Sequence, residues 1–448
     1  MSHRLGPEDS FQLSSPALSR VEGEGALEVT VTAGAVTGVR LRIYEPPRFF
    51  EAMLPGRDYR EPIDLTARIC GICPVAYQLT ASRAIEAACG VTVDGPIRQL
   101  RRLLYCGEWI ESHVLHVAML HAPDFLGYPG VVAMAADHPD LVTRALRLKK
   151  AGNAIVELLG GRPVHPVNLR LGGFFRAPGP ARLRSLEGLL RLAEDDAADL
   201  LAMAARFDFP DLTSDYEFVA LRQPGEYPID AGRLASSAGL DIDAARFERC
   251  VATDQVPYST ALRGRLRGPA VDPIADRPCR GGRYLVGPLA RYALNAGVLP
   301  DRIRQAARDA GLEPVCRNPF RSILVRCVEV LYALGEAIRI IDRYTEPVPS
   351  CVDVAPRAAE GHALTEAPRG TLYHRYRIGA DGVIAEARII PPTAQNQPAI
   401  EDDVRRVAGA FLDCSEDELR HRCEQAIRNH DPCISCATHF LDLRVTRL

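Results

Sequence analysis

The sequence predicts an α+β fold that is mainly helical, with long helices in a central bundle and β-hairpins at its periphery. Apolar residues recur every three or four positions over several long segments, which is typical of amphipathic helices. Two shorter segments alternate apolar and polar residues around turns that contain glycine, which indicates hairpins. The chain has 448 residues, 47% of them hydrophobic, which is enough to bury a large core.

The N-terminal half begins with strands and continues with helices. Alternation over residues 26–44 predicts the first hairpin. Residues 207–300 are rich in Pro, Gly and Arg and contain only short apolar runs, so we predict an irregular segment there. Between these two segments, helical spacing predicts helices at 75–89, 97–121, 139–159 and 181–206.

The C-terminal half returns to helices, interrupted by a second hairpin. Residues 371–378 and 383–390 alternate and are joined by Gly-Ala-Asp-Gly. Ser415 with Glu418 three residues later is a capping-box pattern. Helical periodicity predicts helices at about 301–312, 320–344, 399–412 and 416–429. We therefore divide the chain into an N-terminal hairpin region, a helical core, the irregular segment, a C-terminal part and a tail, at 1–60, 61–206, 207–300, 301–439 and 440–448.

Composition excludes several classes of protein. The net charge of −3 provides no basic footprint for nucleic acid or anionic lipid. The first fifteen residues lack the apolar segment of a secretory signal, and no run of 18 apolar residues could span a bilayer. We expect a soluble, cytoplasmic protein.

Two Cys-x-x-Cys pairs lie about 360 residues apart, Cys70 with Cys73 and Cys433 with Cys436. Four thiolates that meet through the fold could bind a soft transition metal. A zinc ribbon would place its pairs roughly 15–20 residues apart, although a closed four-cysteine zinc site remains an alternative at this point. The other nine cysteines are isolated, and no iron–sulfur spacing or nucleotide-binding glycine loop occurs. The chain therefore has no evident electron relay of its own.

The residues around these cysteines resemble the large subunit of nickel–iron hydrogenases. RICGIC and DPCISCATH contain the two pairs, and six further motifs follow the family's order at 20–25, 46–59, 112–125, 160–173, 366–370 and 389–396. The amino-acid sequences of these motifs are most similar to those of the cytoplasmic, bidirectional, NAD(P)-linked branch, which includes the sulfhydrogenases. The resemblance implies the large-subunit fold of that family and reversible heterolytic cleavage of dihydrogen.

The resemblance also implies a dinuclear metal centre. Cys70 and Cys433 would be terminal thiolates on nickel, and Cys73 and Cys436 would bridge nickel to an iron that carries one carbon monoxide and two cyanides. Cys433 would accept the proton first and Glu22 would take it next. Glu24 stands where relatives usually have His, which leaves the later part of the proton path open.

Further site residues follow from the same motifs. Arg369 matches the guanidinium that the family holds over the metal centre, with Asp124 and Asp431 positioning it. Thr393 matches a hydroxyl that hydrogen-bonds a cyanide. A second metal, magnesium or iron, would be bound by a carboxylate, a backbone carbonyl and an imidazole, those of Glu51, Ile389 and His439. We assign no chemistry to the motif histidines His113, His116, His121 and His165, although His165 could line a partner surface.

The resemblance implies partners as well. Electrons would leave through a small subunit with iron–sulfur clusters and then a flavin- and NAD(P)-binding diaphorase module. A maturation endopeptidase would remove the tail at 440–448 after nickel insertion. Two alternatives stay open: a related enzyme with a deazaflavin or heterodisulfide-reductase acceptor, and a non-catalytic scaffold subunit of a membrane-linked electron-transfer complex.

Overall fold

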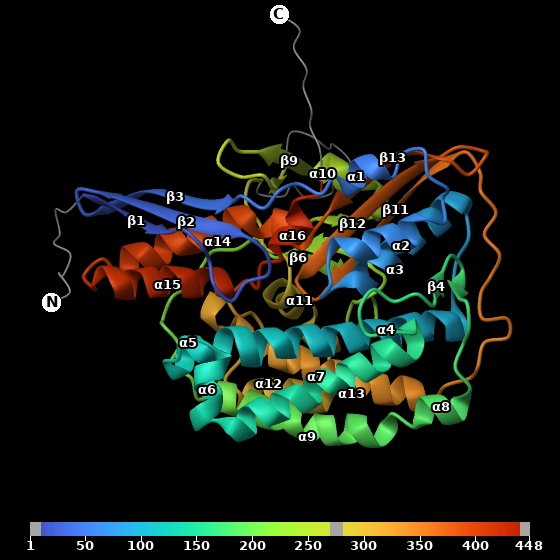
Figure 1. Ribbon diagram of the computed structural model, residues 1–448, viewed down its shortest axis with the longest axis horizontal. Coiled ribbons are helices and arrows are strands. Elements are labelled where there is room, and N and C mark those ends of the chain that lie inside the picture. Colours follow the sequence, from blue (N-terminus) through green and yellow to red (C-terminus); the bar gives the residue numbers. More distant parts are fainter. Residues whose placement is uncertain (1–9, 269–280, 440–448) are drawn as a thin grey trace, which may run out of the picture.

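A bundle of four long helices forms one layer of the molecule. The computed structural model describes residues 10–268 and 281–439. Helix α4 packs against α7 and α13, and α9 packs against the same two helices and so closes the bundle (Figure 1). The bundle confirms the predicted central bundle of long helices, and its members are α4 (Gly95–Val114), α7 (Pro139–Gly160), α9 (Glu187–Ala204) and α13 (Ser322–Asp342).

The α4–α7 contact depends on two glycines. A Cβ added to Gly152 would lie 2.7 Å from both the Gly107 carbonyl oxygen and the Glu111 nitrogen, so the two backbones approach as closely as glycine allows. At its far end α4 continues through a π-helical turn, Leu115–His121, into α5 (Ala122–Leu126). The predicted helix at 97–121 is thus a longer, continuous helical rod.

A second layer lies over the bundle and contains a three-stranded antiparallel sheet (Figure 1). Its strands are β11 (Ala359–Ala367), β12 (Gly370–Ile378) and β13 (Ile384–Ile390), and α3 (Pro74–Cys89) packs on the first two. Strands β12 and β13 confirm the second predicted hairpin. Strand β11 is not predicted from the sequence.

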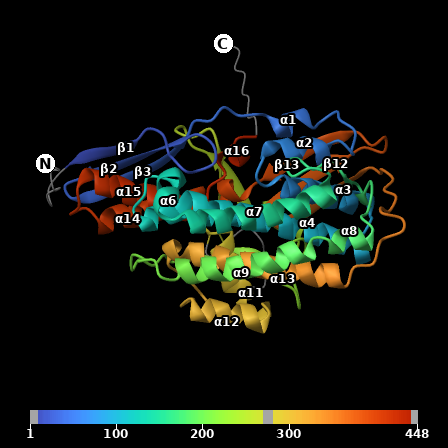
Figure 2. The same ribbon diagram turned by 60° about the horizontal axis from the view of Figure 1, so that its bottom comes forward.

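The two ends of the described chain pack against each other (Figure 2). Strands β2 (Gly25–Thr32) and β3 (Ala35–Ile43) confirm the first predicted hairpin, and β1 (Phe11–Ser15) adds a strand that we do not predict. This sheet lies on α14 (Pro392–Ala410) and α15 (Glu416–Arg428). The Ser415 side chain accepts a hydrogen bond from the Glu418 nitrogen at 3.3 Å, so Ser415 is the N-cap of α15 as the pattern predicts, while the Glu418 carboxylate pairs with Arg422.

The segment at 207–300 is more regular than we predict. Its described residues contain strands of two to five residues and two α-helices: β6 (Val219–Arg222), β7 (Arg233–Ser236), β8 (Asp241–Ile242), α10 (Phe247–Cys250), β9 (Val251–Gln255), β10 (Leu262–Leu266) and α11 (Pro288–Asn295). Strands this short do not produce a detectable alternation in sequence. The remaining short elements are α1 (Phe50–Met53), α2 (Pro62–Thr66), α6 (Val131–Asp137), α8 (Pro180–Arg184), α12 (Asp301–Asp309), α16 (Ile434–Ala437), β4 (Leu169–Arg170) and β5 (Gly173–Phe174). Among the described residues, no helix has both the length and the apolar character needed to cross a bilayer.

Candidate metal centre

The four predicted cysteines meet at one buried place. Cys70 follows a 3-10 turn and Cys73 caps α3, while Cys433 caps α16 and Cys436 lies within it. The Sγ atoms of Cys70 and Cys433 are 3.5 Å apart, and those of Cys73 and Cys436 are 3.7 Å apart. All four sulfurs lie within 4.8 Å of one another. The prediction that the two pairs share one site is therefore confirmed.

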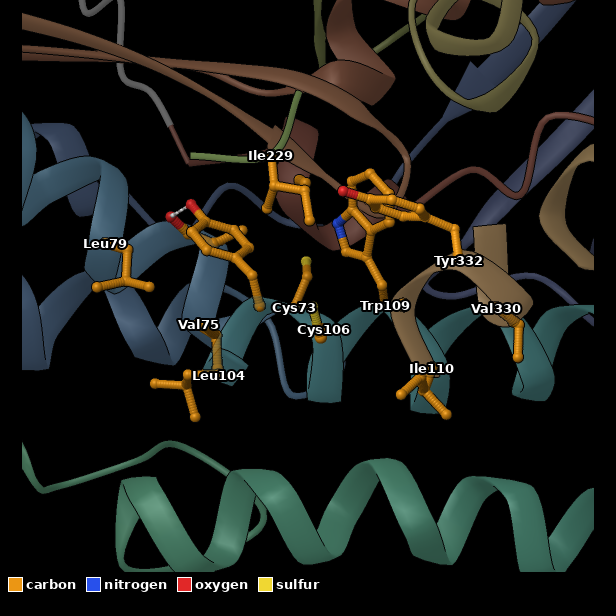
Figure 3. Close-up of a cluster of buried hydrophobic side chains, with 14 of the residues drawn as sticks. Cys73, Val75, Leu79, Leu104, Cys106, Trp109, Ile110, Ile229, Val330 and Tyr332 are labelled. Carbon is orange, nitrogen blue, oxygen red and sulfur yellow. Dashed lines mark hydrogen bonds between the residues drawn. The ribbon is translucent and has the colours of Figure 1, made fainter. Parts of the chain in front are cut away.

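The dimensions and chemistry of this cage fit a thiolate-bound metal. Thiolates at about 2.3 Å from one tetrahedral ion lie roughly 3.8 Å from each other, close to the observed separations. Hydrogen bonds, the largest from the Cys433 thiol, hold the pKa of Cys70 well below its usual range, whereas burial raises the pKa of Cys433. Four thiolates can coexist there only around a cation. Cys73 also lies among the apolar side chains of α3, α4 and α13 (Figure 3).

Glu22 joins the N-terminal sheet to the second cysteine pair. Its carbonyl accepts from the Ile434 nitrogen at 2.9 Å, and its Oε2 accepts from Cys433 Sγ and from the Ser435 nitrogen, both at 3.1 Å. Burial, and secondarily the charge of Cys70, raises the pKa of Glu22. A carboxyl that bonds directly to a cage sulfur and favours its protonated form can exchange a proton with that sulfur.

Ser435 connects Glu22 to a second carboxylate that we do not predict. The Ser435 hydroxyl donates to Glu45 Oε2 at 2.9 Å, while its backbone nitrogen donates to Glu22. The Glu45 side chain is 14% exposed. Glu24, in contrast, is exposed, and its contact with this group is a backbone hydrogen bond to Glu45.

Arg369 lies beside the cage in the turn between β11 and β12. Its Nε donates to the Asp431 carbonyl at 2.8 Å and its Nη2 donates to Asp431 Oδ1 at 3.1 Å. Burial opposes the charge of Arg369, but Asp431 and the cage thiolates outweigh it and raise the pKa of the guanidinium. Arg369 Nη1 and Asp431 Oδ2 are buried without a protein partner in the described chain. The site thus offers one free donor and one free acceptor beside the sulfurs.

A buried arginine that the sequence did not reveal holds the Arg369 turn. Arg291, on α11, has its charge paired with Glu329 at 2.7 Å and with Glu366 at 3.0 Å. It also donates to the carbonyls of the two residues before Arg369, at 2.9 and 2.8 Å. Its guanidinium lies 4.4 Å from the Trp109 ring centroid. Every N–H of Arg291 is therefore used, and the backbone that presents Arg369 is fixed.

Asp124 does not position Arg369, so this part of the predicted site is wrong. Its carboxylate accepts from Arg428 at 2.7 and 2.9 Å, from Arg20 at 2.5 Å and from His121 at 3.1 Å. Asp124 lies on α5, beyond the π-helical turn, and its charge is fully used by these partners. Asp431 alone of the two predicted carboxylates contacts Arg369.

Thr393 contacts the cage at the start of α14. Its Oγ1 accepts from the Cys433 nitrogen at 2.9 Å, so its hydroxyl proton remains available to another acceptor. Thr393 is 3% exposed, which makes an acceptor in the site favourable for this hydroxyl.

The residues predicted for a second metal lie near one another, where α1 meets β13. Glu51 Oε1 accepts from the Ile389 nitrogen at 2.6 Å, and the Glu51 nitrogen donates to the His439 carbonyl at 3.1 Å. Burial lowers the pKa of His439 to about 3, and its Nδ1 has no partner among the described residues. His374 pairs with Ile389 across β12 and β13 and has a buried, unpartnered Nε2. These neutral imidazoles are available to a ligand.

The remaining motif histidines have structural partners. His113 bonds Glu329 at 2.9 Å and His116 bonds the Arg428 carbonyl at 2.7 Å. His165 bonds the carbonyl of Ala67 at 2.7 Å, in the turn that precedes Cys70. None of the three contacts a cage sulfur in the described structure, in agreement with the absence of an assigned role.

Comparison with known proteins decides the family. The pattern of the nickel-dependent hydrogenase family matches residues 48–147 and 317–439. The sulfhydrogenase 2 alpha subunit of Pyrococcus furiosus is 34% identical over 433 residues, which cover 95% of this chain and 98% of the relative. The chain belongs to the nickel-dependent hydrogenase family. It is a hydrogenase large subunit, and thus an oxidoreductase that acts on dihydrogen.

Further hydrogenases support the predicted branch. The sulfhydrogenase 1 alpha subunit of Pyrococcus furiosus is 30% identical over 95% of this chain and 97% of its own length. An F420-non-reducing hydrogenase chain of Methanothermobacter marburgensis is 29% identical over 96% of this chain and 95% of its own length. The structure of an NAD+-reducing [NiFe]-hydrogenase in the H2-reduced state superposes with a TM-score of 0.84 at 26% identity, covering 96% of this chain and 99% of that one. The resemblance and the fold class predicted from the sequence are both confirmed.

Proposed function

We propose that this hydrogenase subunit cleaves dihydrogen heterolytically and reversibly at the Cys70, Cys73, Cys433 and Cys436 cage. The observation that carries the proposal is the 3.1 Å contact from Cys433 Sγ to Glu22 Oε2, because it couples a cage sulfur to a buried carboxyl. When bound, a nickel–iron centre with one carbon monoxide and two cyanides on iron supplies the Lewis acid that polarises dihydrogen. The protein supplies the ligands, the base and the path for the proton.

The proton path that we propose runs from Cys433 to Glu22 and then to Glu45. Ser435 donates to Glu22 through its backbone nitrogen and to Glu45 through its hydroxyl, so it holds the two carboxylates on one residue without itself carrying the proton, and Glu45 reaches the surface. Glu22 can hold the proton because burial raises its pKa toward the working pH. Glu45 would be the exit, because its side chain contacts Ser435, whereas Glu24 contacts Glu45 through its backbone nitrogen.

Two side chains would stabilise ligands of the centre. The free Nη1 of Arg369 would donate to a cyanide or to developing negative charge, and its charge is secured by Asp431. The free hydroxyl proton of Thr393 would donate to a second acceptor. A magnesium or iron ion would bind near Glu51, the Ile389 carbonyl and His439, where one ring nitrogen of His374 and one of His439 are buried without a partner in the described chain.

Isotope exchange tests the role of Glu22. Glu22→Gln keeps the shape and an acceptor for the Ser435 nitrogen but cannot take a proton. We expect exchange between deuterium gas and water to fall about 100-fold or more, since general acid–base groups contribute about that factor. The infrared bands of iron-bound carbon monoxide and cyanide should persist. Exchange at the wild-type rate in Glu22→Gln would remove the proposed base, whereas absent bands in the wild-type enzyme would refute the metal centre.

Glu45→Gln tests the second step of the path. Because this carboxylate lies beyond Glu22, the variant should slow exchange with bulk water while cleavage within the site continues. Conversion of para- to ortho-dihydrogen reports cleavage without proton exit and should remain near the wild-type rate. Glu24→Gln is the matched control, and an effect of Glu24→Gln equal to that of Glu45→Gln would contradict the path.

We propose that an iron–sulfur small subunit docks on the face formed by Val164, Val167 and Phe175. These apolar side chains are 48%, 50% and 60% exposed. Between them in sequence lies His165, which bonds the turn before Cys70, so a partner on this face would bring its clusters close to the cage. Phe175→Glu should reduce copurification of the small subunit, whereas Val132→Glu, at an 86% exposed position on α6, should not.

Electrons would then pass through a flavin-containing diaphorase to NAD(P), and the complex would reside in the cytoplasm, where that acceptor is found. The NAD+-reducing [NiFe]-hydrogenase that this chain resembles supports this acceptor. The F420-non-reducing relatives favour a second candidate, a different acceptor such as a heterodisulfide-reductase system. Measuring reduction of NAD+, NADP+ and a deazaflavin by the purified complex separates these candidates.

The tail at 440–448 lies outside the described residues. We propose that a maturation endopeptidase removes it after His439, which is itself buried and bonded to Glu51. The intact mass of protein produced together with its maturation machinery should correspond to a chain that ends at His439. Full activity in a chain that retains all 448 residues would rule this out.

A further inference from the structure

One side chain outside the cage contacts both cysteine segments. Arg48 Nη2 donates to the Ile69 carbonyl at 2.7 Å and to the Ser435 carbonyl at 2.6 Å. Ile69 immediately precedes Cys70, and Ser435 immediately precedes Cys436. A single nitrogen therefore links two backbone positions that lie more than 360 residues apart in the chain and next to one sulfur of each pair.

The backbone around Arg48 strengthens this link. Its own nitrogen donates to the Thr438 carbonyl at 2.8 Å, and the Glu51 nitrogen donates to the His439 carbonyl at 3.1 Å. The guanidinium also lies 5.5 Å from the Phe50 ring centroid, with Glu45 at 3.8 Å from its Nε. The segment after β3 thus binds the chain within α16 and immediately after it, while the Arg48 side chain remains 34% exposed.

We propose that Arg48 is a positioning residue that holds the two cysteine pairs at the spacing required by the metal, an inference that rests on the cage being a metal site. Each pair is fixed within its own segment, so the separation between pairs depends on contacts that cross from one segment to the other. Before a cation binds, the four cysteines are free, so no covalent or metal bond at the cage keeps the two segments from separating. Charged donors to two backbone carbonyls oppose that separation directly.

Arginine suits this role better than lysine does. The planar guanidinium presents two N–H groups on Nη2 in fixed directions, one for each carbonyl, and its Nη1 lies 3.4 Å from the carbonyl of Arg68. A lysine ammonium is shorter and loses more conformational freedom on making the same bonds. Arg48→Lys should therefore restore only part of the function that Arg48→Met removes.

Cobalt binding to the full chain, purified without its maturation machinery, tests the proposal. Co2+ bound to thiolates gives a strong charge-transfer absorption that reports on the cage itself, independent of hydrogenase activity. Arg48→Met keeps the apolar stem and removes the donors, and we expect it to weaken Co2+ binding about tenfold or more, since two charged hydrogen bonds are lost. Arg57→Met is the control, because Arg57 is 55% exposed and pairs only loosely with Glu61 at 3.6 Å.

A second measurement does not require metal. After mild oxidation with diamide, peptide mapping gives the share of disulfides that join the segments, such as Cys70 to Cys433, relative to those within a pair. Arg48→Met should lower this share, and Arg57→Met should not. Each variant is measured well below its own Tm, so that unfolding does not contribute.

The outcomes are distinct. Wild-type Co2+ affinity and an unchanged disulfide share in Arg48→Met would overturn the role of Arg48 and leave the metal site intact. Failure of the wild-type chain to bind Co2+ would overturn the metal site, and the inference about Arg48 with it. Loss of affinity in Arg48→Met with partial recovery in Arg48→Lys would support the proposal.

Discussion

Asp124 shows how neighbours decide the role of a buried charge. Its side chain is inaccessible to solvent, yet burial is outweighed by hydrogen bonds from His121 and by the charge of Arg428, which together hold the pKa of Asp124 well below its usual range. The carboxylate therefore stays ionised and links α5 to α15. The family resemblance implies that Asp124 positions Arg369, but a motif does not show which of several buried arginines a carboxylate will contact, and here it contacts Arg428.

Asp124→Asn should destabilise the chain by about 3–5 kcal/mol at neutral pH, because Arg20 loses its paired carboxylate and the buried Arg428 keeps only Glu424, at 3.3 Å. The folded pKa lies below the unfolded one, so the stabilising contribution is complete above about pH 4 and is lost as the pH falls toward the folded pKa. Tm measured against pH should show the difference from wild type shrinking below about pH 4. Asp199→Asn, at a 62% exposed position, should have little effect at any pH.

Arg369→Lys tests the charge beside the cage. Lysine keeps the charge but lacks the planar guanidinium, whose Nε and Nη2 donate to the carbonyl and the carboxylate of Asp431 at the same time. We expect turnover to fall by about 100- to 1,000-fold, the usual loss for a donor preorganised toward developing charge. The cyanide infrared bands should shift but remain. Unchanged turnover would show that the charge alone suffices.

At the scale of elements, the α4–α7 crossing determines how close the bundle layer can approach the site. Helix α4 contributes Trp109 beneath Arg291 and also Glu108, whose two oxygens accept from the Val75 and Ala76 nitrogens at 2.6 and 3.1 Å, at the start of α3. The position of α4 thus determines where the Cys73 end of α3 lies.

Gly152→Ala should destabilise the chain by about 1–3 kcal/mol, the usual cost of overpacking, because its Cβ would meet backbone atoms at 2.7 Å. Gly188→Ala is the matched control on α9, where an added Cβ has no neighbour within 4 Å. It should be neutral or stabilising by up to about 1 kcal/mol. Equal Tm values for the two variants would contradict the close crossing.

Several helices and strands can be predicted from the sequence, whereas others cannot. Long helices and the two hairpins follow from their periodicity and from the turn at 379–382. Helix α14 begins at Pro392, before the predicted start, because Pro391, Pro392 and Pro398 obscure the helical pattern although proline is tolerated at the first helical position. Strand β11 contains Gly361 and small residues, which break the alternation of apolar and polar side chains. Position 361 requires glycine because a Cβ at this position would lie 2.0 Å from the Ala84 carbonyl oxygen of α3.

Some residues of the candidate site could likewise be predicted from the sequence, and others could not. The cysteines, Glu22, Arg369 and Thr393 lie in motifs and could be found from them. Arg291 and Glu45 lie in stretches without a distinctive pattern, and only the tertiary fold places them beside the Arg369 turn and Ser435.

For the whole molecule, the cage acts as a cross-link between the two ends of the chain. A ligand that binds only the folded state stabilises it, by about 2.7 kcal/mol at a concentration one hundred times its Kd. Saturating Co2+ should therefore raise the Tm of the apo chain. Cys436→Ser should abolish the rise, and Cys351→Ala, outside the cage, should retain it. A rise that persists in Cys436→Ser would place the metal elsewhere.

The separation of the cysteine pairs also sets an order of events during synthesis. Cys70 and Cys433 are 363 positions apart, so at usual elongation rates the first pair leaves the ribosome roughly 20–70 seconds before the second. Throughout that interval half of the ligands are absent. Nickel delivery must therefore follow translation, and the early pair must stay reduced while the rest of the polypeptide is made.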